Sequence, residues 1–98
     1  MPREVNLVNI KGPTSIYIDA EITDAGDLRL SGQDIGQAPR EVFGDSDYEY
    51  WLTVPSAHKD DVLLALLKTQ YSGNASAVTE LKAYLELRGI PCVFDSYA

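Results

Sequence analysis

Acidic and aromatic residues alternate in the stretch GDSDYEYW, residues 44–51 of the chain. A calcium-binding loop begins with oxygen ligands at alternate positions, and two neighbouring carboxylates can serve as general acid and base. Tyr50, however, stands where a calcium loop needs glycine, and Ser56 stands where it needs glutamate. On a strand, Asp47 and Glu49 would lie about 6–7 Å apart on an open face, with no pocket to separate their pKa values. We therefore expect neither a metal site nor paired-carboxylate catalysis here, and no cofactor.

Nucleophilic catalysis also has little support in the sequence. His58 is the only histidine and Cys92 the only cysteine. We expect His58 to be solvated in the first turn of a helix and Cys92 to be a small buried residue of a last strand. The stretch GQDIG at residues 32–36 lacks the lysine and the hydroxyl residue of a phosphate-binding loop. The sequence thus predicts a protein that is not an enzyme and has no catalytic residues.

The charge balance is the one unusual bulk property. Fifteen acidic and eight basic residues give a formal net charge of −7 and an isoelectric point near 4.4. This balance argues against nucleic-acid binding, which needs a basic footprint; it favours a basic protein partner, or a surface that keeps the protein in solution. The longest apolar run, residues 62–67, is far shorter than the ~20 residues that span a bilayer. With a lone cysteine and no signal-peptide pattern in residues 1–6, a cytoplasmic location without membrane contact is expected.

Alternation with a period of two predicts a β-hairpin. Residues 15–23 place apolar side chains on one face and polar ones on the other. The next three residues end in glycine, which suits a tight hairpin connection. In the register that follows, Ile22 opposes Leu28 and Glu21 opposes Arg29, so apolar and oppositely charged pairs each share a face.

Residues 47–54 predict a third strand, and residues 5–10 suggest an additional amino-terminal one. Residues 32–45, which connect the hairpin to this third strand, form the longest expected loop. Within that loop, Pro39 begins a short helical turn that ends at Gly44, and we expect the Val42 and Phe43 side chains there to enter the core.

Two helices and a final strand complete the predicted order. The first helix begins with Ser56 as its N-cap. Asn74 or Ser76 caps the second helix, which ends at Gly89 in a left-handed conformation. Residues 90–94 then predict a last strand at a sheet edge, because a proline near its start cannot donate to the ladder.

These elements predict a single α+β domain over residues 1–98, in the order (β)-β-β-β-α-α-β. Its antiparallel sheet has four or five strands, with two helices packed on one face. The expected core draws on the sheet, both helices and the last strand. It consists of Ile16, Ile18, Ile22, Leu28, Leu30, Tyr50, Leu52, Val54, Val62, Leu66, Leu81, Leu85, Ile90 and Phe94.

The sheet face opposite this core combines acids with two large aromatic residues. Tryptophan and tyrosine anchor protein–protein contacts, while exposed acids steer a basic partner toward them. The plainer alternative is that other segments cover Trp51 and that the acids are simply hydrated. The predicted partner-binding residues are Tyr17, Asp19, Glu21, Asp47, Glu49 and Trp51.

Two further interpretations remain open. In the first, the chain binds a small ligand or is an enzyme that uses the 32–45 loop, with Gln33, Asp34 and Tyr48 lining a cleft. In the second, it is a structural protein that forms a homodimer through its last strand or its open sheet face.

Three motifs carry a resemblance to known proteins. GQD-hydrophobic-G at residues 32–36, FG with DYEYW at 43–51 and GIP at 89–91 resemble a group of small acidic bacterial proteins without an assigned function, over about residues 15–95. The motifs are structural and carry no active site. By size, charge and compartment the chain is also similar to bacterial immunity proteins, which neutralise a cognate basic toxin. This analogy implies a non-enzymatic protein that binds such a toxin.

Overall fold

The computed structural model describes residues 3–97. These residues divide into two compact units, with the boundary between Leu63 and Leu64. The first unit contains an antiparallel sheet and a short helix, and the second is helical. The chain is therefore α+β, as the sequence predicts. No helix among the described residues is long and apolar enough to cross a membrane. Two predictions depend on how the two units are arranged: that two helices pack on the sheet, and that the chain is a single domain. Both remain predictions.

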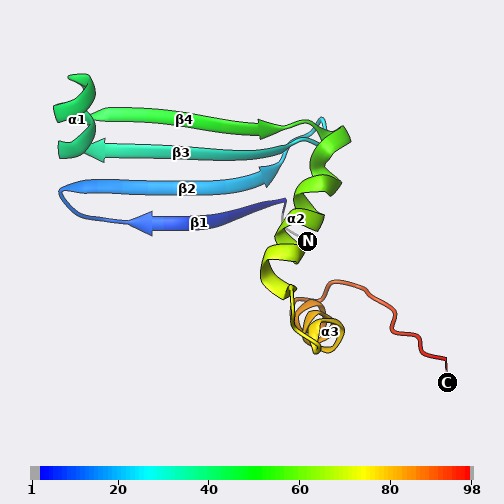
Figure 1. The fold of residues 1–98 in the computed structure, drawn as a ribbon. Helices are drawn as coiled ribbons and strands as arrows, with labels where there is room; N and C mark the ends of the chain where they lie inside the picture. The colour runs from blue at the N-terminus through cyan, green and yellow to red at the C-terminus, as the bar shows by residue number, and fades with distance from the viewer. Residues whose placement is uncertain (1–2, 98) are drawn as a thin grey trace. The chain divides into compact units, whose positions relative to one another are not determined.

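The sheet is a meander in which each strand pairs with the next along the chain (Figure 1). Its strands are β1 Glu4–Ile10, β2 Thr14–Ile22, β3 Leu28–Gly36 and β4 Asp47–Val54. The suggested amino-terminal strand is thus present, as an edge strand. Its pairing with β2 shifts between Asn6 and Val8, a bulge of the kind that makes an edge less able to pair with another chain.

The hairpin of β2 and β3 has the predicted register. Ile22 opposes Leu28 and Glu21 opposes Arg29. The amide of Thr23 donates to the carbonyl of Asp27 at 2.8 Å, and Gly26, with φ 88°, takes the left-handed conformation that the turn requires. Local alternation and turn length were therefore sufficient to predict this part of the sheet.

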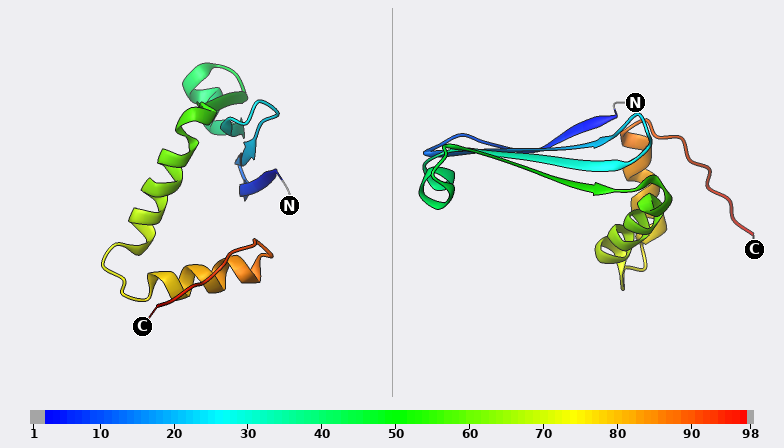
Figure 2. Two further views of the ribbon diagram at one scale, coloured as in Figure 1. Left: turned by 90° about the vertical axis from the view of Figure 1, so that its right-hand side faces the viewer. Right: turned by 90° about the horizontal axis from the view of Figure 1, so that it is seen from above.

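Register and alternation give the sheet two chemically different faces. The apolar face consists of Val5, Val8, Ile10, Ile16, Ile18, Ala20, Ile22, Leu28, Leu30, Tyr48, Tyr50, Leu52 and Val54, with Gly32 and Asp34 among them. The acidic face consists of Tyr17, Asp19, Glu21, Arg29, Ser31, Gln33, Asp47, Glu49, Trp51 and Thr53. Figure 2 shows the strands as a single twisted layer with a short helix, α1, at one end.

The predicted loop over residues 32–45 is mostly regular structure. β3 continues to Gly36, and α1 follows at once as Gln37–Phe43. The expected helical turn is present, but Val42 and Phe43 are exposed rather than part of a core. The strand was missed because its continuation, GQDIG, has the composition of a turn, whereas pairing with β2 and β4 holds it extended.

After β4 a 3₁₀ turn, η1 (Ser56–His58), leads into α2, Lys59–Tyr71. Ser56 makes no side-chain cap; instead its amide donates to the Asp27 carboxylate at 2.8 Å, which ties the start of the helical segment to the β2–β3 turn. The helix therefore begins three residues later than predicted. Lys59 adds a second link, because its ammonium donates to the carbonyl of Gly26 at 2.9 Å.

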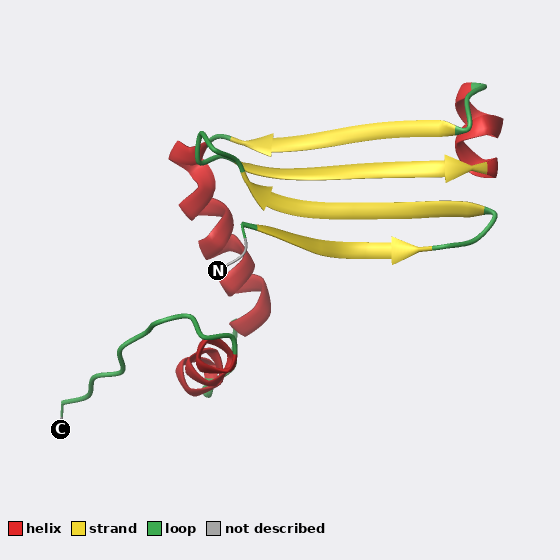
Figure 3. Cartoon of the chain, turned by 180° about the vertical axis from the view of Figure 1, so that it is seen from behind, coloured by secondary structure: helices red, strands yellow, loops and turns green. Residues whose placement is uncertain are grey.

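In the second unit, α3 spans Ala77–Leu87, and Gly89 is left-handed (φ 68°) as predicted. The predicted strand over residues 90–94 is wrong: the residues after α3 are irregular (Figure 3). Cys92 is accordingly exposed instead of buried. A strand needs a hydrogen-bonded partner, and within this unit the segment lies along α3, which offers none. The order is thus β-β-β-(α)-β-α-α, not the predicted one.

The predicted core is wrong in its burial. No hydrophobic side chain with a described position is buried, and Leu52 and Phe94, two members of the expected core, are 61% and 59% exposed. The sheet unit, taken by itself, has one layer of structure, so nothing in it lies above its apolar side chains. In the second unit only the irregular segment of residues 92–94 lies along α3, and it leaves an open groove there.

Candidate functional site

The acidic face places all six predicted partner-binding residues on one side of β2, β3 and β4. Three cross-strand rows build it. Tyr17, Gln33 and Glu49 form the first row; Asp19, Ser31 and Trp51 form the second; Glu21, Arg29 and Thr53 form the third, and Asp47 lies beside the first. Because side chains alternate along a strand, these residues project from the same surface.

Trp51 is the largest exposed side chain of this face. It lies in the middle row of β4, and 60% of its surface is exposed. Its neighbour across the ladder is Ser31, whose side chain is too small to cover an indole. Trp51 is therefore not covered by another segment of the sheet unit, and a large apolar surface is available among hydrated acids.

The charges of the face are strongly unbalanced. Arg29 is the one basic residue of the acidic face, and its Nε donates to the Glu21 carboxylate at 2.8 Å. The Asp19 carboxylate accepts a hydrogen bond from the side-chain nitrogen Nδ2 of Asn6 at 2.8 Å. This one cation is paired to Glu21. Asp19, Asp47 and Glu49 therefore have no cationic partner on this face, and the surface attracts basic groups.

The two carboxylates of the DYE stretch are held by an amide. The side-chain nitrogen of Gln33 donates to Asp47 at 3.1 Å and reaches Glu49 at 3.5 Å. The carboxylate of Asp45 accepts the Asp47 amide at 3.1 Å, which fixes the start of β4. Within residues 3–97, no group of three or more histidine, cysteine or acidic residues is placed to hold a metal ion. This arrangement orders the acids as a surface and does not enclose them.

The alternative ligand site is divided between the two sheet faces. Gln33 lies on the acidic face, whereas Asp34 and Tyr48 oppose each other on the apolar face. Asp34 accepts a hydrogen bond from the Tyr50 hydroxyl at 2.9 Å, and Tyr48 stacks on Phe43 with ring centroids 4.4 Å apart. The three residues thus do not line one cleft, because adjacent residues of a strand point in opposite directions.

Tyr50 has the clearest electrostatic perturbation of the sheet. Removal of its phenol from water and its hydrogen bond to the negative Asp34 both raise the pKa of Tyr50 above its ordinary 10.0. This is a structural effect: the hydroxyl holds Asp34 on an otherwise apolar surface. His58, the other candidate for acid–base chemistry, is exposed, with Nδ1 3.4 Å from a carboxylate oxygen of Asp61.

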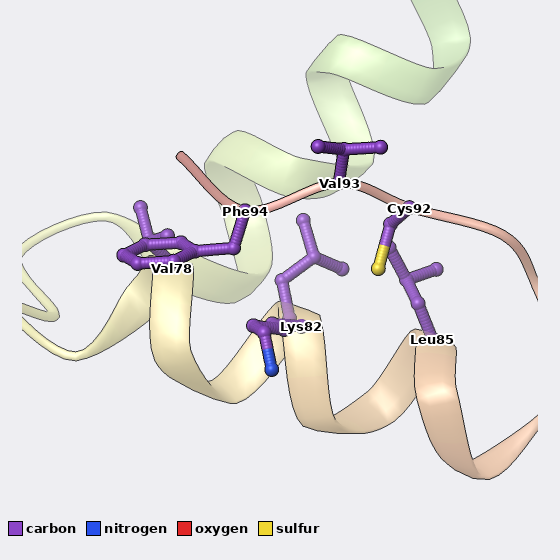
Figure 4. Close-up of a pocket in the computed structure, with 7 residues that line it drawn as sticks. Val78, Lys82, Leu85, Cys92, Val93 and Phe94 are labelled. Carbon is purple, nitrogen blue, oxygen red and sulfur yellow. The ribbon is translucent and has the colours of Figure 1, made fainter. Parts of the chain in front are cut away.

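A shallow apolar groove in the second unit was not predicted from the sequence. It has a volume of about 190 Å³ and lies between α3 and the segment that follows it (Figure 4). Its lining is Val78, Leu81, Lys82, Leu85, Cys92, Val93 and Phe94. The signal in the sequence was the apolar alternation of residues 90–94, which was interpreted as a strand. The groove is open and carries one charged group, so it presents no catalytic arrangement.

Comparison with protein-family models, with curated proteins and with solved structures finds no match to this chain.

Proposed function

We propose that the chain is a non-enzymatic protein-binding domain whose acidic face binds a basic surface of another protein. One observation carries the proposal: Trp51 is 60% exposed in the middle of a face on which acids outnumber bases. A largely exposed aromatic residue among acids has the composition of a contact anchor, since tryptophan is enriched where binding energy concentrates.

The charged residues have a separate role in this proposal. Asp47 and Glu49 flank Tyr48 along β4 and lie on the same side as Trp51. Their fields attract a basic partner over distances near the Debye length, and this raises the association rate more than the final affinity. We therefore expect Asp47 and Glu49 to set mainly the association rate and Trp51 to set mainly the affinity.

The most concrete form of the proposal is an immunity protein that neutralises a basic toxin. The net charge of −7 and the exposed acids on β2 and β4 support it. A toxin that cleaves nucleic acid carries a basic active surface, and an acidic face can cover that surface in place of phosphate.

The test uses the product of the reading frame that neighbours the gene, co-expressed and purified with the chain. Binding is measured by calorimetry at two salt concentrations. The Trp51→Ala variant should bind about 30-fold more weakly or worse, the loss expected for a hot-spot residue. The variant with Asp47→Lys and Glu49→Lys should associate more slowly, with a weaker dependence on salt.

The matched control is the pair Asp60→Lys and Asp61→Lys in the first turn of α2. It changes the net charge by the same amount at a place outside the acidic face. Its binding should stay close to that of the wild type. Equal losses in both double variants would show that bulk charge, and not this face, attracts the partner. If the neighbouring reading frame does not encode a basic protein, the proposal of an immunity protein is contradicted, and the more general proposal of a protein-binding domain remains.

A further inference from the structure

The outer edge of β4 carries a row of backbone groups that the sheet does not use. The amide of Gly36 donates to the carbonyl of Ser46 at 2.7 Å. This bond sets the alternation of the β3–β4 ladder, so the backbone groups of even-numbered β4 residues point to β3, and those of Glu49, Trp51 and Thr53 point outward. Among the described residues, no strand pairs with this outer row.

The row ends at both ends of the strand. The Asp47 amide also points outward, but it donates to the Asp45 carboxylate at 3.1 Å. At the other end stands Pro55, which has no N–H group. The free donors and acceptors are therefore limited to three residues in the middle of β4.

The two edges of the sheet differ in how well they are protected. β1 changes its register between Asn6 and Val8, and the Asn6 side-chain nitrogen donates to the Val8 carbonyl at 3.1 Å. A bulge of this kind makes an edge less able to pair. β4 pairs with β3 over its whole length without an irregularity and contains neither proline nor lysine. β4 is therefore the edge that can accept a further strand.

The helical unit offers no strand for this edge. α2 and α3 use their backbone groups within the helices, so neither can satisfy an open strand edge, however the two units are arranged. The irregular segment after α3 is the remaining candidate among the described residues. Its residues Cys92, Val93 and Phe94 line the groove along α3 within their own unit, and Pro91 removes a donor. A strand from another molecule satisfies the outer row better.

A second copy of β4 fits this row in an antiparallel register. When the two-fold axis passes between the two Trp51 residues, Trp51 opposes its counterpart and Glu49 opposes Thr53 of the second copy. All three outward residues then exchange their backbone hydrogen bonds. The ladder ends where the occupied amide of Asp47 meets Pro55, so no free group of the row is left without a partner.

Charge supports the same register. No carboxylate opposes another in it, whereas a register centred on Glu49 would oppose the two Glu49 side chains, and like charges in that position destabilise a sheet. A register centred on Tyr50 would need the Asp47 amide that Asp45 already holds. Because β1 is protected, pairing through β4 closes at two copies and does not continue into a filament.

We propose that the chain forms a homodimer in which two β4 strands pair antiparallel about Trp51 and join the two sheets into one. Residues directly opposite each other share a face, so both acidic faces lie on the same side of the joined sheet. The dimer does not depend on the binding of a basic partner, because backbone groups of the edge hold it together.

Amide hydrogen exchange of the full chain, followed by NMR, tests which backbone groups the dimer uses. Protection of the Glu49, Trp51 and Thr53 amides should follow the dimer fraction, measured by light scattering over about 1 to 100 µM, because a homodimer dissociates on dilution. The mass should fall from twice 10.8 kDa toward 10.8 kDa over this range. The Tyr50 and Leu52 amides, which point to β3, should be protected at every concentration.

A proline substitution at the edge provides the second measurement. Thr53→Pro removes an outward N–H without removing a bond to β3, and it should raise the dissociation constant about tenfold or more. The matched control is Asn9→Pro on β1. Asn9 opposes Tyr17, whose backbone groups point to β3, so the groups of Asn9 also point outward. This variant should dissociate as the wild type does.

Each other outcome would overturn the proposal. A wild type that stays at 10.8 kDa throughout would show that no second copy pairs with β4. Protection of the three outward amides in that monomer would show that a segment of the same chain covers the row. Fast exchange of these amides in a dimer would place the contact elsewhere, as would equal effects of the two proline variants. The exchange measurement uses the wild type, so it decides even if Thr53→Pro does not fold.

Discussion

Replacement of Gly32 by alanine should destabilise the sheet, although alanine is normally the better residue in a strand. Gly32 opposes Tyr50 across the β3–β4 ladder. A Cβ on Gly32 would lie 2.7 Å from Cδ2 of the Tyr50 ring and closer still to Cε2 and Cζ. These separations are shorter than any real carbon contact, so the ring would have to swing away.

The size of the effect follows from what Tyr50 loses when it moves. Its hydroxyl donates to Asp34 at 2.9 Å, and its ring lies 5.3 Å from that of Tyr48. A hydrogen bond to a charged group contributes about 1.5–3 kcal/mol, and at this partly exposed site the lower end applies. The aromatic contact adds about 0.5–1 kcal/mol. Alanine recovers about 0.5–1 kcal/mol of backbone entropy, which leaves a net loss of about 1–2 kcal/mol.

Urea denaturation at one fixed protein concentration measures this loss, and a double-mutant cycle identifies its cause. In a Tyr50→Ala background the ring is absent, so Gly32→Ala should be neutral or slightly stabilising. A Gly32→Ala protein as stable as the wild type would refute the reasoning. So would an equal loss in both backgrounds, because the cost would then come from the backbone and not from the ring.

Two further predictions concern the start of α3 and the ionisation of Tyr50. The side-chain oxygen of Asn74 accepts a hydrogen bond from the Ser76 amide at 2.9 Å, and its side-chain nitrogen donates to Glu80 at 2.8 Å. Ser76 itself makes no side-chain cap. Thermal unfolding should therefore show that Asn74→Ala lowers the free energy of unfolding by about 1 kcal/mol and that Ser76→Ala lowers it much less. Asp34→Asn should lower the raised pKa of Tyr50 toward 10.0, as followed by NMR. Because the folded state favours the neutral phenol, the contribution of Tyr50 to stability is complete below the pKa of tyrosine in the unfolded chain, about 10, and is lost as the pH rises through the pKa of Tyr50 in the folded protein. A pKa of Tyr50 that is unchanged in Asp34→Asn would contradict the assignment to Asp34.

The parts of the fold that local patterns determine were predicted correctly. Ile22 and Leu28 pair as expected, because alternation and a three-residue connection leave one register that keeps both on the same face. The acidic face follows from the same rule, which is why the six predicted partner-binding residues on it could be grouped without coordinates. Trp51 was identified in this way, although its exposure was not predictable from the strand pattern alone.

The parts that depend on contacts distant in sequence were not predicted. Gly32 looks like a turn residue, and only the ring of Tyr50 above it explains why a glycine lies inside a strand. Ser56 is a residue type that favours the N-cap position, but its amide donates a hydrogen bond to the Asp27 carboxylate, and a 3₁₀ turn replaces the first helical turn. Val93 and Phe94 have strand propensity, yet propensity gives no strand where a hydrogen-bonding partner is absent.

The meander also has a consequence for how the chain acquires its structure. Every ladder joins strands that are consecutive in sequence, and none requires a residue beyond Val54. Such short-range closures cost little chain entropy and proceed quickly. During synthesis from the amino terminus, the whole sheet can therefore be complete while residues 64–98 are still inside the ribosome.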